Sequence, residues 1–208
     1  MGLGDSLRKW ATSKATELLN ADSQTRDAGP SAREQAEEQE VRDEIASLPL
    51  ATVQLSVTGL VSGQWSGQLH WAWNDISPDE PDPTDPYADK PLVWFELFSE
   101  HTARPDLGGL LLRHWSFQIP GYHGDGAYDL TAIALERQAA GARLEYLEWA
   151  MNFANAKDSP FYFHPGAPQS SVTVSGGGKK LSAVIGLRGT RGDLTATATI
   201  DRARRPAG

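Results

Sequence analysis

The sequence predicts a mainly β protein, with an antiparallel β-sandwich or jelly-roll-like domain that follows an N-terminal α-helical arm. Two observations support this prediction. After residue 50, apolar and polar side chains alternate in short segments that turn residues separate. Before residue 49, apolar residues recur at helical spacing instead. We therefore expect an arm at 1–48, a β-sandwich domain at 50–203 and a flexible tail at 204–208.

The N-terminal arm is predicted to contain two helices. In residues 3–20 most apolar side chains fall on one side of a helix, which makes that helix amphipathic. Ser31 then begins a second, highly charged helix, with Glu34 completing a capping box and an expected end near Ser47. The residues of the first helix that we expect to bind a partner are Leu3, Leu7, Trp10 and Leu18.

The first half of the β domain is predicted to begin with a hairpin. Alternation marks one strand at 53–58 and a second at 68–73, and Gly63 and Gly67 are expected to bracket the turn between them. Residues 92–98 are apolar on both faces, so they predict a central strand.

The second half of the β domain continues the pattern. Strands are predicted at 110–119 and, more briefly, at 161–163. The segment 171–200 alternates strictly between glycine-containing turns, which predicts a closing three-stranded antiparallel meander.

Residues 127–153 allow two interpretations. Their content of Ala, Leu, Glu, Arg and Gln suits a helix, but Gly141 interrupts the helical pattern. The all-β surroundings favour a hairpin of strands 128–136 and 144–152 joined around Gly141, and a helix remains the alternative.

Composition limits the functional classes. The net charge of −8 disfavours binding to nucleic-acid phosphates. The chain has no cysteine, which excludes disulfides and thiolate zinc sites. The sequence shows neither an apolar run long enough to span a bilayer nor a secretory signal, so we expect a soluble, acidic, cytoplasmic protein.

Two loops and the tryptophans of the predicted strands are considered as places where a ligand could bind. The acidic, proline-rich segment 74–90 lacks the spacing of a calcium-binding loop, so it predicts a solvated, mobile connection. The glycine-rich segment 121–129 lacks a nucleotide-binding fingerprint and predicts a tight interstrand loop. Because indole rings can stack on sugars, the candidates for binding a ligand are three tryptophans with two polar residues of the second loop. These are Trp65, Trp71, Trp73, His123 and Asp125.

No set of residues predicts a particular enzyme, so the leading hypothesis is a non-catalytic interaction or assembly protein. The amphipathic arm would attach it to a protein partner, to another copy of itself or to a membrane surface. We expect no metal, cofactor or nucleic-acid partner. One alternative is a module that binds carbohydrate or another ligand through exposed tryptophans. A weaker alternative is a metal-assisted hydrolase that uses His114, His123, Asp125 and Asp129.

Overall fold

The computed structural model describes residues 32–76, 82–99, 102, 104–142, 149–154, 160–165 and 169–202. The chain divides into two units, with the boundary between Leu48 and Pro49. The first unit contributes helix α2, Ala32–Ser47, which confirms the second helix of the predicted arm. The helix expected at 3–20 and the tail expected at 204–208 lie outside the described residues. Among the helices that are described, none is long and apolar enough to cross a membrane.

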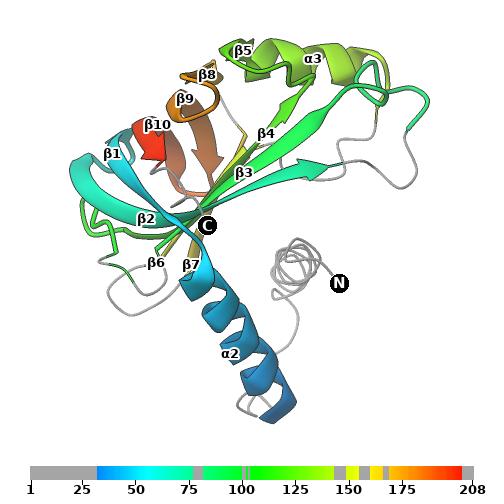
Figure 1. The fold of residues 1–208 in the computed structure, drawn as a ribbon. Helices are drawn as coiled ribbons and strands as arrows, with labels where there is room; N and C mark the ends of the chain where they lie inside the picture. Colours follow the sequence, from blue (N-terminus) through cyan, green and yellow to red (C-terminus); the bar gives the residue numbers. More distant parts are fainter. Residues whose placement is uncertain are drawn as a thin grey trace. The chain divides into compact units, whose positions relative to one another are not determined.

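The second unit is built on one antiparallel sheet, with helix α3 beside strands β5 and β8 (Figure 1). The predicted mainly β class is therefore confirmed. The elements are β1 (Leu50–Gly59), β2 (Gly63–Ile76), β3 (Leu92–Phe98), β4 (Leu111–Pro120), β5 (Gly126–Asp129), α3 (Leu130–Ala139), β6 (Trp149–Ala154), β7 (Pro160–Pro165), β8 (Ser171–Ser175), β9 (Lys180–Gly189) and β10 (Gly192–Arg202).

The sheet closes on itself. Strand β10 pairs with β1 on one side and with β9 on the other, so β1-β2-β3-β4-β6-β7-β9-β10 form a ring. Strand β8 pairs with a separate stretch of β9 and is followed in the sheet by β5. The predicted β-sandwich or jelly-roll-like arrangement is therefore not confirmed, since the described strands belong to one sheet. Alternation reveals which strands have a buried face, but it cannot distinguish two facing sheets from one sheet that curls until its ends pair.

The core lies inside the ring, where every second side chain of the strands points. On β1, Val53 and Leu55 face inward opposite Gly67 and Trp65 of β2. The predicted meander is confirmed, since β8, β9 and β10 pair in succession and the apolar residues of β9 and β10 are buried. The largest fully buried side chains include Trp115, Phe95, Phe117, Phe153, Phe163, Leu69 and Met151.

Two local predictions need correction. Residues Leu130–Ala139 form helix α3 rather than the first strand of a hairpin. Asp129 caps the first turn by accepting a hydrogen bond from the Ala132 N–H, and Gly141 follows the helix with a φ of 81° that favours glycine. Gly67 lies within β2 rather than at the turn before that strand. The Trp65 ring occupies the space that a side chain at Gly67 would need.

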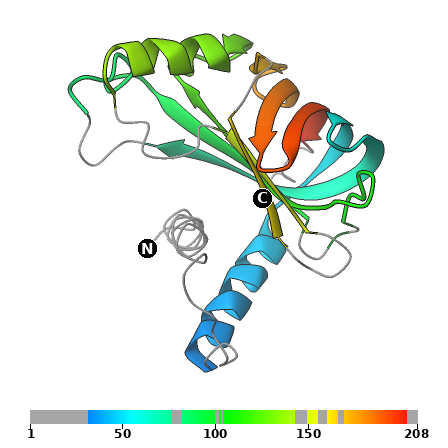
Figure 2. The same cartoon turned by 180° about the vertical axis from the view of Figure 1, so that it is seen from behind.

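Figure 2 shows the same arrangement from behind, with α3 and the short strands at one end of the ring of strands. At this end the loop before β5 and the end of β10 both hydrogen-bond to the turn between β8 and β9.

Candidate ligand site at one end of the closed sheet

An arginine occupies the inward face of the sheet at the end of β10. The buried alternation of that strand, which includes Ala198 and Ile200, continues to Arg202, and Arg202 pairs with the buried Ala51 of β1. Trp71 and Trp73 share the inward face of β2, because they oppose the buried Leu97 and Phe95. The period of two therefore brings a cation and two indoles to the same face.

The guanidinium of Arg202 lies over both indoles. Its central carbon is 4.6 Å from the ring centroid of Trp71 and 4.4 Å from that of Trp73. Tyr122 packs edge-on against Trp73, with centroids 5.1 Å apart. A side chain at Gly178 would lie 2.8 Å from Arg202 Nη2, and the φ of 75° at this position favours glycine. We call Arg202, Trp71, Trp73, Tyr122 and Gly178 the arginine site.

The arginine site is rich in donors and poor in acceptors. Buried Nε of Arg202 and buried Nε1 of Trp71 have no hydrogen-bond acceptor among the described residues. No carboxylate in the described part of the chain forms an ion pair with Arg202. A buried donor without an acceptor costs about 1–3 kcal/mol. Attraction between the cation and the rings offsets part of that cost, at about 0.5–2 kcal/mol.

Burial shifts both ionisable groups of the arginine site. It lowers the pKa of Arg202, which the neighbouring Tyr122 counters. Burial also raises the pKa of Tyr122, reinforced by Tyr128 and opposed by Arg202. At neutral pH the arginine site therefore presents a guanidinium cation and a neutral phenol.

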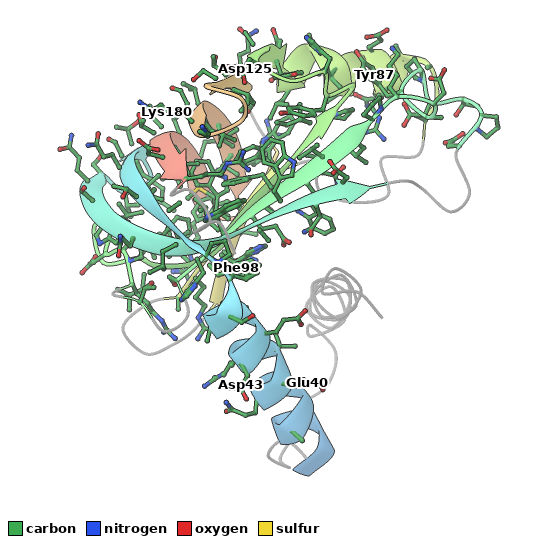
Figure 3. The ribbon with its side chains drawn as sticks, in the orientation of Figure 1. Glu40, Asp43, Tyr87, Phe98, Asp125 and Lys180 are labelled. Carbon is green, nitrogen blue, oxygen red and sulfur yellow. The ribbon has the colours of Figure 1, made fainter. Side chains whose placement is uncertain are left out.

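Asp125 fastens the glycine turn that covers this end of the sheet (Figure 3). Its carboxylate accepts hydrogen bonds from the N–H groups of Gly177 at 2.8 Å and Gly178 at 2.9 Å. These two bonds lower the pKa of Asp125. Asp125 thus positions Gly178 against Arg202, and its oxygen atoms are already engaged by backbone donors.

His123 lies beside the arginine site, toward helix α3. Its ring centroid is 5.0 Å from that of Tyr128, and its backbone N–H donates to the Tyr128 hydroxyl at 3.1 Å. Tyr128 stacks in turn on Tyr122 at 5.8 Å. His123 also lines a cleft of about 330 Å³ with Lys90 and residues of β5 and α3.

The acidic segment is fixed where the structure describes it. Asp85 accepts hydrogen bonds from Nε and Nη2 of Arg137, at 2.9 and 2.7 Å, and both side chains are at least 86% buried. The Tyr87 hydroxyl, near the end of α3 in Figure 3, donates to Glu136 at 2.7 Å. Residues Asp85 and Tyr87 of the segment 82–90 are therefore held against helix α3, which corrects the expectation that this loop is only solvated.

The predicted ligand residues are only partly brought together. Trp71 and Trp73 belong to the arginine site, and His123 and Asp125 adjoin it through Tyr128 and Gly178. Trp65 is further along β2, where its half-buried ring packs over Gly67. All three tryptophans face the core rather than forming an exposed row. The partner-binding residues Leu3, Leu7, Trp10 and Leu18 lie outside the described residues, so docking through them stays a prediction.

The residues of the hydrolase alternative lie apart in separate interactions. His114 is on the outer face of β4, where its Nε2 is 3.0 Å from Oε1 of the buried Glu96. Asp125 holds the glycine turn and Asp129 caps α3. Within the described part of the chain, no three His, Asp or Glu side chains converge as metal ligands.

Sequence reasoning overlooked Arg202 and Tyr122. The signal for Arg202 was present, because the inward alternation of the last strand continues past Ile200 to residue 202. Tyr122 had no such signal, since it lies in a loop whose course depends on the closure of the sheet. Comparisons with family models, curated proteins and solved structures found no match to this chain.

Proposed function

We propose that the β unit is a non-catalytic binding domain for a small anionic ligand, which Arg202 holds at the arginine site. The observation that carries the proposal is the half-buried guanidinium, which among the described residues contacts aromatic rings and no carboxylate. Burying a cation without an anionic partner is unfavourable, and a bound carboxylate, phosphate or sulfate would supply that partner.

The neighbours of Arg202 support a binding role. The Nε1 group of Trp71 offers a second donor, and the hydroxyl of Tyr122 lies next to the cation. The strands fix both tryptophans, and Asp125 fixes the turn at Gly178, so little conformational entropy would be lost on binding. The described groups act as donors to an anion rather than as a general base, which favours binding over catalysis.

The test is titration of the full chain with sodium phosphate, sulfate and benzoate, followed by tryptophan fluorescence and thermal unfolding. Sodium chloride at equal ionic strength serves as the reference. At least one anion should shift both signals more than chloride does. Arg202→Gln should weaken that binding by about tenfold or more, since it removes a charge-assisted hydrogen bond.

Arg188→Gln is the matched control, because Arg188 lies on the neighbouring strand with a 68% exposed side chain. It should bind the anion like the parent protein. The proposal is overturned if no anion acts beyond chloride, or if Arg202→Gln binds as well as Arg188→Gln. Either result would show that Arg202 has a structural role, packed against Trp71 and Trp73, and does not bind an anion.

A further inference from the structure

The outer face of β1, β2 and β10 has an unusual composition. Every outward position from Thr52 to Thr58, from Gln64 to Gln68 and from Thr195 to Thr199 is serine, threonine or glutamine. Outward positions on neighbouring β9 instead include the charged residues Lys180 and Arg188. Over these positions the three adjacent strands present hydroxyl and amide groups without a formal charge, and the outward carboxylates of β10, Asp193 and Asp201, lie beyond the two ends of that range.

This face is hollowed. A depression of about 520 Å³ lies over the three strands. Its outward-pointing lining is Gln54, Ser56, Gln64, Ser66, Thr197 and Thr199. Among the described residues none of these six side chains has a hydrogen-bond partner, so their donors and acceptors are available to a ligand. We call these six residues the hydroxyl–amide face.

The hydroxyl–amide face rests on a rigid base. Residues that alternate with it, such as Val53 and Ala196, are fully buried. Pairing across the strands fixes neighbours, with Ser56 opposite Thr197 on one side and opposite Gln64 on the other. Serine and threonine have few rotatable bonds, so ordering them around a ligand costs little entropy.

The chemistry of the hydroxyl–amide face selects its occupant. Sugar hydroxyls both donate and accept hydrogen bonds, as do the hydroxyl and amide groups of this face. A second copy of the chain, or a polyanion, would meet a molecule with a net charge of −8. We propose that the hydroxyl–amide face binds a neutral oligosaccharide. This site is separate from the arginine site and does not depend on it.

The test is calorimetric titration of the full chain with neutral hexasaccharides of glucose, mannose and N-acetylglucosamine. At least one should bind in the millimolar range or tighter. Thr197→Lys and, independently, Ser56→Lys place a long charged side chain in the depression. Each should weaken binding by about tenfold or more, the loss of roughly one hydrogen-bonded contact, while the melting temperature stays near that of the parent protein.

Thr173→Lys is the matched control, because Thr173 is an outward, exposed residue of β8 beyond the depression. This variant should bind the sugar like the parent protein. The proposal is overturned if no hexasaccharide binds, or if both lysine variants bind as well as Thr173→Lys. The proposal is also overturned if the chain binds no sugar and sedimentation shows a dimer that Thr197→Lys dissociates. That result would assign the hydroxyl–amide face to self-association.

Discussion

The ion pair between Asp85 and Arg137 joins residues that are 52 positions apart. Two nitrogen atoms of the guanidinium reach the same carboxylate oxygen, and the second oxygen accepts the N–H of Tyr87 at 2.9 Å. Such a pair, largely withdrawn from water, holds the 82–90 segment against α3. Breaking it would leave a buried guanidinium without this partner.

We therefore expect Asp85→Ala to lower the free energy of unfolding by about 1–3 kcal/mol. Urea denaturation of the full chain measures this change. Asp89→Ala in the same segment is the control, because Asp89 is exposed and should change stability little. Equal stability of the two variants would show that the ion pair contributes nothing.

The phenol of Tyr87 should ionise at an unusually high pH. Burial, then the hydrogen bond and charge of Glu136, raise the pKa of Tyr87 to about 12. A phenol with a raised folded pKa stabilises the protein below its unfolded value of about 10, and this stability is lost as pH rises toward 12. Glu136→Gln removes the negative charge, so it should lower the pKa of Tyr87.

Phenolate absorbance during alkaline titration measures this shift, and Tyr87→Phe identifies the relevant transition. Asp193→Asn, a carboxylate removed elsewhere on the surface, should leave the transition in place. If Glu136→Gln titrates like the parent protein, the charge of Glu136 does not raise the pKa of Tyr87.

At the scale of elements, the sequence predicted strands better than it predicted α3. Alternation located the strands around Val53 and Ile185, because a half-buried strand needs little beyond that pattern. The segment 130–139 was misassigned because helix propensity competed with an all-β context. Its deciding feature is the cap at Asp129, a single side chain whose partner depends on the backbone.

The cap itself can be tested. Asp129 accepts the Ala132 N–H at 2.9 Å through one oxygen, and its other oxygen accepts from Gln169. We expect Asp129→Ala to destabilise the protein by about 0.5–2 kcal/mol, with Asp129→Ser retaining part of that stability. Thermal unfolding and amide protection in α3 measure the effect. A fully stable Asp129→Ala variant would contradict a capping role.

At the scale of the whole molecule, closure could not be predicted from the chain. The residues of β10 alternate like those of any strand, and nothing in LTATATI specifies two partners on opposite sides. The arginine site depends on this closure, because pairing with β1 brings Arg202 beside the tryptophans of β2. Of the five residues predicted to bind a ligand, Trp71 and Trp73 therefore lie in the arginine site, but the sequence did not point to Arg202 between them.

We expect residues 50–203 to fold without the first unit, since every strand that the structure describes lies beyond the boundary at Pro49. The fragment should show a strand-dominated circular dichroism spectrum and one cooperative melt. A shorter fragment, 50–190, lacks β10 and leaves β1 and β9 without a shared partner, so it should not melt cooperatively. Similar melting of both fragments would contradict the importance of closure.

The ring also has a weakest joint. Strand β7 meets β9 through two residue pairs, His164 with Arg188 and Pro165 with Leu187, and a proline has no N–H to donate. By contrast, β9 and β10 pair continuously from Lys180 to Gly189. Local opening of the sheet should start between β7 and β9. In native-state hydrogen exchange the amides of β7 should therefore lose protection well before those of β10. The strands could then part and rejoin along one line while the remaining ladder stays intact.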